Sequence, residues 1–141
     1  MVILKAQNSD LEKVRSFYTE CGYGGGAEEK DVILMAMEND KIIGVVRLCT
    51  EFGSLTLRGM QISKDFQKRG IGKKLLESLN EIIGNDTCYC LPHDYLEKFY
   101  EHIGFRKIKN SSAPPDLQQR FDAYKKKGYS LIIMKKWVLM K

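Results

Sequence analysis

Apolar residues gather in several short stretches in the first half of the chain, with turn-forming residues between them. Short apolar stretches bounded by turn signals are typical of strands. The stretches are residues 2–6, 31–38, 41–50 and 54–62. Asn39 and Asp40 leave a two-residue turn between the second and third stretches, which favours a hairpin. The first half is therefore expected to form an antiparallel meander.

Two further stretches carry apolar residues at helical spacing. Residues 11–21 follow Asn8, Ser9 and Asp10, which are residue types that cap helices. The second stretch is residues 71–83. Its apolar positions are Ile71, Leu75, Leu76, Leu79, Ile82 and Ile83. This spacing predicts a helix with one buried face.

The rest of the chain alternates between short strands and helices. We expect strands at residues 87–91, 105–109 and 129–139, and helices at residues 94–103 and 116–127. A meander followed by strand–helix–strand units gives a mixed α/β fold. The expected architecture is a mostly antiparallel central sheet of about seven strands flanked by helices. A chain of 141 residues can form one core, so we expect a single domain over residues 1–141.

The most informative segment joins the strand at 54–62 to the helix at 71–83. It reads Gln67-Lys68-Arg69-Gly70-Ile71-Gly72. Glycines at such a junction leave the first helical N–H groups unshielded. These donors, together with the positive end of the helix dipole, bind phosphate groups. Basic side chains surround the junction, namely Lys68, Arg69, Lys73 and Lys74. The segment therefore indicates a phosphate-bearing ligand.

Two better-known phosphate loops do not fit this segment. The nucleotide P-loop needs glycine in place of Gln67 and serine or threonine in place of Lys74. The dinucleotide fingerprint needs a third glycine in place of Leu75. Residues 22–27 do spell a dinucleotide-like pattern, but they follow a helix instead of a strand. We interpret residues 22–26 as a flexible loop.

The pattern Gln67-x-x-Gly70-x-Gly72 resembles the acetyl-CoA-binding motif of the GCN5-related N-acetyltransferase (GNAT) superfamily. A second match lies about thirty residues downstream, where Phe99-Tyr100-x-x-x-Gly104-Phe105 is similar to the family's segment between a helix and the next strand. The order of the elements agrees with the family along nearly all of the chain. The resemblance implies the acyl-CoA N-acyltransferase fold and acetyl-CoA as cosubstrate.

The resemblance also implies roles for individual residues. The backbone of Met60, Gln61 and Ile62 is expected to bind the pantetheine arm and to polarise the thioester carbonyl. Gln67 occupies the first position of the motif. The N–H groups expected to bind the pyrophosphate are those of Lys68, Arg69, Gly70, Ile71, Gly72 and Lys73. Tyr100 is expected to donate a proton to the CoA sulfur, although its spacing alone would make it a core tyrosine.

The general base has no clear candidate among the acidic residues. The strands at 54–62 and 87–91 lack the Asp or Glu that several family members place there. His93 follows the second of these strands and titrates in a suitable range, but it could equally cap the helix or contact the CoA arm. Glu28 and Glu29 could line the acceptor pocket. Ordered water could also serve an amine whose pKa is lowered.

These inferences favour direct transfer of an acetyl group to an amine of a small molecule or peptide. A ternary complex is expected because no cysteine or serine is convincingly placed as an acyl carrier. The alternative is a non-catalytic acyl-CoA sensor that kept the cofactor site and lost the base. The last strand could pair with a second copy across a two-fold axis, which would give a homodimer.

The charge distribution bears on the choice of partner. The net charge is +5. Residues 106–141 contain ten basic residues and only two acidic ones, Asp116 and Asp122. A basic surface could attract nucleic acid. However, no aromatic residues interleave the lysines at 125–127 as they do in single-strand-binding platforms. We therefore expect no nucleic-acid partner, and the anionic CoA suits the basic residues near the glycines.

Hydropathy and cysteine usage favour a cytoplasmic protein. The apolar runs are far shorter than the roughly 18 residues of a membrane span, and the N-terminus lacks signal-peptide features. Four cysteines without an export signal suggest reduced thiols. Cys88 and Cys90 share one strand face near His93 and His102, but this spacing matches no usual zinc pattern. We expect buried thiols and no metal.

Overall fold

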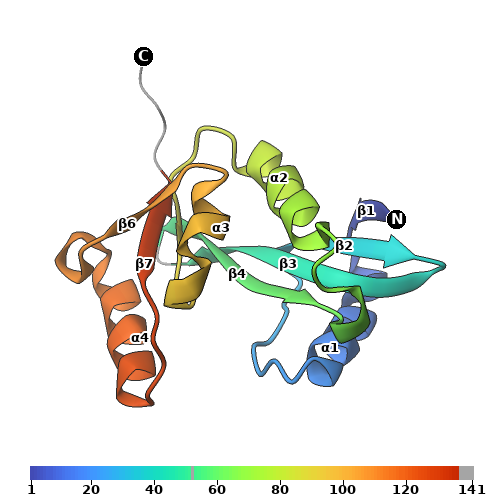
Figure 1. The fold of residues 1–141 in the computed structure, drawn as a ribbon, viewed down its shortest axis with the longest axis horizontal. Helices are drawn as coiled ribbons and strands as arrows, with labels where there is room; N and C mark the ends of the chain where they lie inside the picture. Colours follow the sequence, from blue (N-terminus) through green and yellow to red (C-terminus); the bar gives the residue numbers. More distant parts are fainter. Residues whose placement is uncertain (52, 137–141) are drawn as a thin grey trace. The chain divides into compact units, whose positions relative to one another are not determined.

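A computed structural model describes residues 1–51 and 53–136 of the chain (Figure 1). Within these residues, seven strands and four α-helices form a mixed α/β fold with a mostly antiparallel, seven-stranded sheet. This confirms the predicted fold class. The chain divides into two compact units. The first comprises residues 1–50 and 57–82, and the second comprises residues 51–56 and the chain from residue 83 onward.

The first unit holds most of the elements that the meander pattern predicted. They are β1 (Val2–Lys5), α1 (Leu11–Glu20), β2 (Val32–Glu38), β3 (Lys41–Glu51), β4 (Ser54–Ile62) and α2 (Ile71–Ile83). β2 pairs antiparallel with both β1 and β3, and Met35 lies opposite Leu4 and Val45. Asn39 and Asp40 have φ values of 50° and 62°. A tight two-residue hairpin requires such left-handed residues, so the predicted turn is confirmed.

α1 and α2 cover opposite faces of the strands in the first unit (Figure 1). Two neighbouring residues of β3 show this, because successive side chains of a strand point to opposite faces. Val45 lies in a core cluster with Val14 and Phe17 of α1. Gly44 faces α2, since a Cβ atom built on it would lie 3.1 Å from Cδ1 of Leu75. The sheet therefore separates α1 from the helix that follows the glycine motif.

The second unit is a smaller arrangement of three strands and two helices among the described residues. Its elements are β5 (Cys88–Cys90), α3 (Glu97–Glu101), β6 (Phe105–Ile108), α4 (Pro115–Lys126) and β7 (Ile133–Lys136). β7 lies between β5 and β6 and is antiparallel to both, with Met134 opposite Cys90 and Lys107. Leu117 of α4 packs in a core cluster with Tyr89 and Ile133. This core fixes the strand that precedes α3.

Two predicted elements of the second unit are shorter than expected. The helix expected at residues 94–103 begins as a 3-10 turn, Asp94–Leu96, and its α-helical part spans only Glu97–Glu101. The strand expected at 129–139 begins at Ile133. Its first residues bond to the segment before α3 instead, because the N–H of Asp94 donates to the carbonyl of Ser130 at 2.9 Å. The predicted residues 137–139 lie outside the described part of the chain.

α2 differs from its predicted pattern at one position. Leu75, Leu76 and Leu79 are fully buried, but the side chain of Ile82 is 43% exposed. Ile83 at the next position is buried, so Ile82 lies at the edge of the buried face of α2. α2 spans 13 residues, and no helix among the described residues is both long and apolar enough to cross a membrane.

Candidate active site

The segment between β4 and α2, residues 63–70, carries the first half of the predicted site. We call it the β4–α2 turn. Its start is fixed by a hydrogen bond of 2.8 Å from the N–H of Ser63 to the carbonyl of Ile43 in β3. The side-chain amide of Gln67 donates to the carbonyl of Ile62 at 3.2 Å. The first residue of the motif thus ties the turn back to the end of the strand.

Two residues of the turn have left-handed backbone conformations. Gly70 has a φ of 78° and Lys68 a φ of 63°. A left-handed conformation costs an L-residue about 1–2 kcal/mol, and such strain is concentrated at functional sites. The helix begins directly afterwards, since the N–H of Lys74 donates to the carbonyl of Gly70 at 3.1 Å. No sequence signal pointed to the left-handed conformation of Lys68, because glycine and asparagine are the usual residues in this conformation.

The surroundings of the turn suit an anion. Lys68, Arg69 and Lys73 are all exposed, and the Arg69 guanidinium lies 5.1 Å from the ring centroid of Phe66. The free N–H groups of a helical first turn and the positive end of the helix dipole attract negative charge. The β4 residues Met60, Gln61 and Ile62 lead directly into this turn. Sequence and structure therefore place all ten predicted cofactor-binding residues on one continuous strand–turn–helix segment of the first unit.

Gly44 of β3 was not among the predicted site residues. A Cβ atom built on it would lie 2.9 Å from Cδ1 of Ile62 and 3.1 Å from Cδ1 of Leu75. Real Cβ atoms essentially never come as close as the first of these distances. Gly44 thus lets the end of β4 and the first turns of α2 approach β3. A glycine inside an apolar strand, which often marks a close approach, was the available signal.

Tyr100, the predicted proton donor, lies on α3 in the second unit. Its side chain is buried, with 5% exposed. The ring packs edge-on against Phe99 and Phe105, with centroid distances of 5.0 and 6.1 Å. Gly104 follows the helix with a φ of 103°, which allows the chain to turn directly into β6. The aromatic and glycine residues of this motif therefore have a packing role here.

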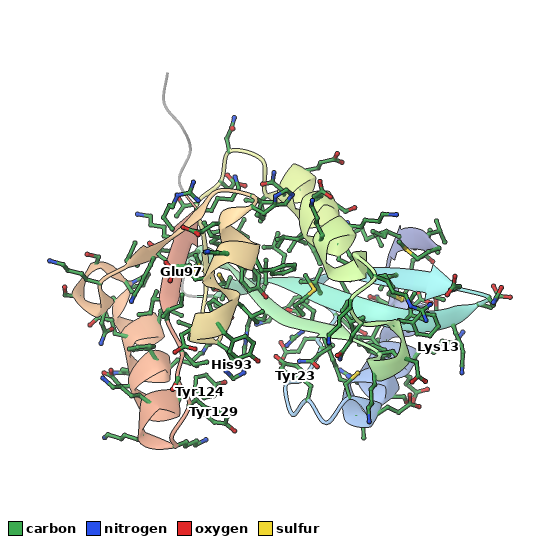
Figure 2. The ribbon with its side chains drawn as sticks, viewed as in Figure 1. Lys13, Tyr23, His93, Glu97, Tyr124 and Tyr129 are labelled. Carbon is green, nitrogen blue, oxygen red and sulfur yellow. The ribbon has the colours of Figure 1, made fainter. Side chains whose placement is uncertain are left out.

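His93, the predicted base, lies just before the 3-10 turn that leads into α3. Its ring stacks on Tyr95, with centroids 5.4 Å apart and planes 8° apart, and lies 6.4 Å from the ring of Tyr129. Tyr129 in turn contacts Tyr124, so His93 belongs to a small group of aromatic residues in the second unit (Figure 2). His93 is exposed, and Tyr95 is 76% exposed.

Comparisons with known proteins identify the family. A family model described as an acetyltransferase (GNAT) domain matches residues 29–107. The chain belongs to the GNAT acetyltransferases. This confirms the predicted resemblance and makes the protein an acyltransferase. No curated protein matches the chain significantly.

Solved structures similar to this GNAT chain agree with its fold. The Rv2747 protein from Mycobacterium tuberculosis, solved in complex with CoA, has a TM-score of 0.72 at 16% identity, covering 99% of this chain and 100% of its own. The ribosomal-protein-S18-alanine N-acetyltransferase from Escherichia coli has a TM-score of 0.67 at 18% identity, covering 99% and 95%. A GNAT acetyltransferase from Staphylococcus aureus Mu50 has a TM-score of 0.66 at 19% identity, covering 96% and 97%. At these identities the likeness establishes the fold.

Glu28 and Glu29, the acidic pair beside the glycine loop, are exposed in this acetyltransferase. The carboxylate of Glu28 lies 3.5 Å from the ammonium group of Lys30. The backbone N–H of Glu28 donates to the carboxylate of Asp31 at 2.9 Å. The acidic pair therefore sits on a turn of defined backbone geometry.

The two cysteines of β5 are buried, as expected. Burial raises the pKa of the Cys90 thiol well above its usual value, and Cys88 makes a further contribution.

The basic C-terminal region is not a uniform charged face. Arg120 forms an ion pair with Glu51, and Lys136 is 9% exposed with its ammonium group 3.4 Å from the carbonyl of Gly84.

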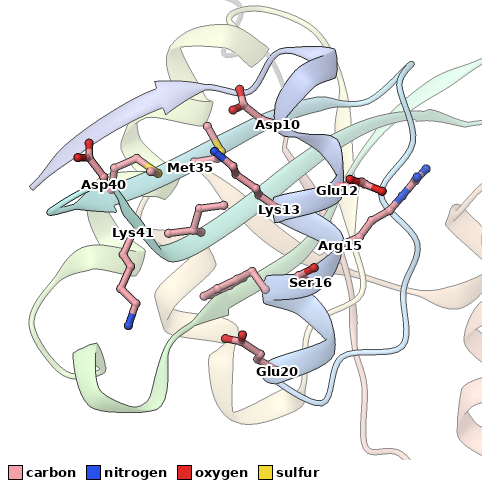
Figure 3. A pocket seen from close by; sticks show the side chains of 12 residues that line it. Asp10, Glu12, Lys13, Arg15, Ser16, Glu20, Met35, Asp40 and Lys41 are labelled. Atoms are coloured by element: carbon pink, nitrogen blue, oxygen red, sulfur yellow. The ribbon is translucent and has the colours of Figure 1, made fainter.

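A separate hollow of about 700 Å³ lies between α1 and the β2–β3 hairpin (Figure 3). Phe17, Met35 and Ile42 are apolar residues in its lining. Its rim carries both acidic and basic side chains, so opposite charges are interspersed there. None of the predicted site residues lines this hollow.

Proposed function

We propose that this protein transfers an acetyl group from acetyl-CoA to an amine of a small molecule or peptide. The observation that carries the proposal is the geometry of the β4–α2 turn. The side chain of Gln67 donates a hydrogen bond to the carbonyl of Ile62, and the carbonyl of Gly70 accepts the first helical hydrogen bond, at 3.1 Å from the nitrogen of Lys74. This arrangement suits a pyrophosphate at a helix N-terminus. Membership of the GNAT family supports the reaction class.

On the donor side, each part of acetyl-CoA has a proposed partner. The backbone of Met60, Gln61 and Ile62 binds the pantetheine arm and polarises the thioester carbonyl. N–H groups from Lys68 to Lys73 bind the pyrophosphate, and the exposed basic side chains nearby complement its charge. Placing hydrogen-bond donors where negative charge develops stabilises the tetrahedral transition state of acyl transfer.

The proton transfers are proposed for residues of the second unit. The amine nitrogen attacks the thioester carbon directly, the bond between that carbon and sulfur breaks, and the thiolate takes a proton. Tyr100 donates that proton, since a phenol is protonated at neutral pH. His93, or ordered water, accepts the proton that the amine loses. Glu28 and Glu29 line the acceptor pocket in this proposal.

The remaining proposals concern organisation. We propose that both compact units belong to one N-acetyltransferase domain over residues 1–141 and that the protein works in the cytoplasm as a possible homodimer. The four cysteines all lie among the described residues and form no disulfide there, which supports this compartment. Size-exclusion chromatography with light scattering would determine the oligomeric state.

An acceptor screen tests the function. Purified protein is incubated with acetyl-CoA and a panel of amines that includes polyamines, aminoglycosides, lysine and peptides with free N-termini. Release of free CoA is followed with a thiol reagent, and mass spectrometry must show an acceptor that gained one acetyl group. Binding of acetyl-CoA without any acetylated product would favour the non-catalytic sensor. Failure to bind either CoA or acetyl-CoA would contradict both readings.

A further inference from the structure

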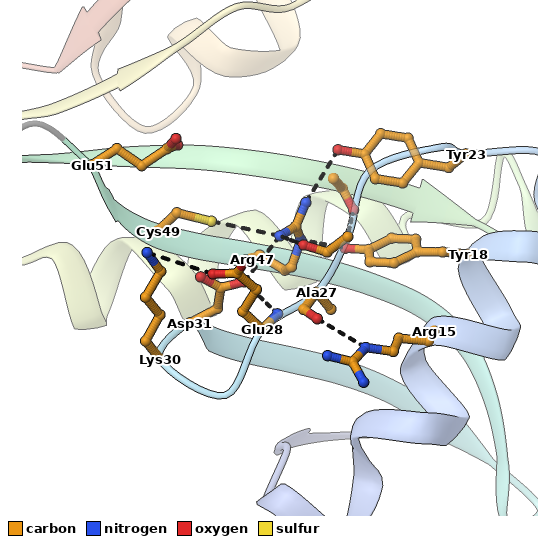
Figure 4. A network of polar contacts seen from close by, with 12 residues as sticks. Arg15, Tyr18, Tyr23, Ala27, Glu28, Lys30, Asp31, Arg47, Cys49 and Glu51 are labelled. Carbon is orange, nitrogen blue, oxygen red and sulfur yellow. Dashed lines mark hydrogen bonds and ion pairs between the residues drawn. The ribbon is translucent and has the colours of Figure 1, made fainter.

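A buried arginine organises one end of the first unit. Arg47 of β3 is 2% exposed, and its guanidinium hydrogen-bonds to α1 and to the segment between α1 and β2 (Figure 4). Among the described residues it forms an ion pair with Asp31, whose carboxylate lies 3.0 Å away. Burial opposes the charge on Arg47, but the nearby Tyr18, Cys49 and Tyr23 and the hydrogen bond to Asp31 raise its pKa above the usual value.

One arm of this network reaches β4. Nε of Arg47 donates to the hydroxyl oxygen of Tyr18 at 3.3 Å, and that hydroxyl donates to the carbonyl of Gly59 at 2.8 Å. Burial raises the pKa of Tyr18 well above the usual value for tyrosine, and the nearby Arg47 offsets only part of this rise. The phenol therefore keeps the proton that it donates to Gly59.

Gly59 is the residue directly before the proposed pantetheine-binding strand segment. Its φ of 66° is left-handed, and a Cβ atom built on it would lie 2.4 Å from the hydroxyl oxygen of Tyr18. Within a strand, such a residue redirects the backbone that follows it. Tyr18 occupies the space that a side chain at Gly59 would need. The Tyr18–Arg47 pair thus holds the backbone that leads into Met60.

The other arm of the network reaches the segment between α1 and β2, residues 22–31. Nη1 of Arg47 donates to the carbonyl of Gly26 at 2.8 Å, and Nη2 donates to the hydroxyl of Tyr23 at 3.3 Å. Asp31 also accepts the N–H of Glu28 at 2.9 Å. Residues 22–26 form a loop, as expected, and two residues of this loop, Tyr23 and Gly26, are hydrogen-bonded to a buried guanidinium.

We propose that Arg47 is a positioning residue that orients the donor-binding backbone of β4 and the acceptor-side turn at Glu28 through one hydrogen-bond network. The inference rests on the proposed function. A buried ion pair is commonly no more stable than apolar residues of the same volume, so stability alone does not account for it. The directional bonds of a guanidinium can instead fix several backbone segments at once.

Two matched tyrosine variants separate positioning from stability. Tyr18→Phe and Tyr23→Phe each remove one hydroxyl that lies 3.3 Å from Arg47, but only Tyr18 bonds to β4. The probe is acetyl-CoA labelled with ¹³C at the thioester carbonyl, bound to the full-length protein without any acceptor. A polarised carbonyl resonates downfield of the free cofactor. Amide hydrogen exchange of residues 59–62 reports on the backbone independently of ligand.

We expect Tyr18→Phe to lose at least about half of the downfield shift and to speed exchange at residues 59–62 by roughly tenfold or more. CoA, which lacks the thioester, should still bind within about threefold of wild type. Tyr23→Phe should keep both the shift and the slow exchange. Equal behaviour of the two variants in both measurements would overturn the proposal. If wild-type protein bound no CoA, the proposed function would fail, whereas the exchange comparison would still decide whether Tyr18 holds β4.

Discussion

Gly44 and Ile62 lie so close together that the space between them has no room for a methyl group. A Cβ atom built on Gly44 would lie 2.9 Å from Cδ1 of Ile62. Ile62 ends β4 and accepts the hydrogen bond from Gln67, so this contact fixes where the β4–α2 turn begins. Close packing on one strand thereby determines the position of the turn for which we propose phosphate binding.

Gly44→Ala should therefore weaken CoA binding as well as stability. The added methyl group must displace Ile62 or Leu75, and overpacking of this kind costs about 1–3 kcal/mol. Calorimetric titration with CoA and urea unfolding measure the two effects. Gly24→Ala is the matched control, because a Cβ atom there meets nothing within 4 Å. Unchanged CoA affinity in Gly44→Ala would show that the contact does not position the turn.

Tyr100→Phe should lower kcat while leaving acetyl-CoA affinity nearly unchanged. The ring keeps its contacts with Phe99 and Phe105, and only the hydroxyl proposed to protonate the leaving thiolate is lost. General acid catalysis contributes about 10²–10⁴-fold to rate. Steady-state kinetics with the best acceptor from the screen, together with direct titration of acetyl-CoA, provide the two values. Parallel losses of binding and turnover would mean that Tyr100 is structural.

Variants of Lys68 should separate its charge from its backbone conformation. Lys68→Gly removes the charge and relieves the left-handed strain, whereas Lys68→Ala removes the charge and keeps the strain. Both should bind CoA more weakly, and both should show a smaller salt dependence of binding than wild type. The glycine variant should be more stable than the alanine variant by about 1 kcal/mol. Equal unfolding free energies would indicate that the turn relaxes when the lysine is replaced.

Arg47→Met should destabilise the protein by about 3–5 kcal/mol, because it leaves the buried carboxylate of Asp31 without an opposing charge. The side chain of Asp31 is 3% exposed. The double variant Arg47→Met/Asp31→Asn should recover part of this loss, since it removes the uncompensated charge. Chemical denaturation of both single variants and the double variant gives the coupling energy. Strictly additive effects would argue against the ion pair.

Stability should fall at alkaline pH because of Cys90. Its folded pKa is raised, mainly by burial and also by Cys88, so the unfolded chain loses the thiol proton first. The contribution of the neutral thiol is thus complete below about pH 8.5 and declines as pH rises above it, by at most about 1.4 kcal/mol per pH unit. Cys90→Ala should flatten this decline in urea unfolding between about pH 7 and pH 9.5. Cys21→Ala, which changes a partly exposed thiol, should flatten it much less.

Three features could be predicted from the sequence alone: the strand order of the meander, the tight turn at Asn39–Asp40 and the glycine junction before α2. These features depend on local periodicity and on residue types that favour turns, so they can be read one segment at a time. The GNAT resemblance was carried by two such local motifs, one ending at Gly72 and the other at Phe105.

The contacts that hold these segments in place became apparent from the three-dimensional structure. Arg47, Tyr18 and Gly59 are far apart in sequence, and no local pattern pairs a buried guanidinium with the phenol that bonds to a strand carbonyl. The same holds for Gly44, whose role depends on the side chains of β4 and α2. The roles of these residues depend on contacts between segments that are distant in sequence, because burial and close approach arise only when such segments share one core.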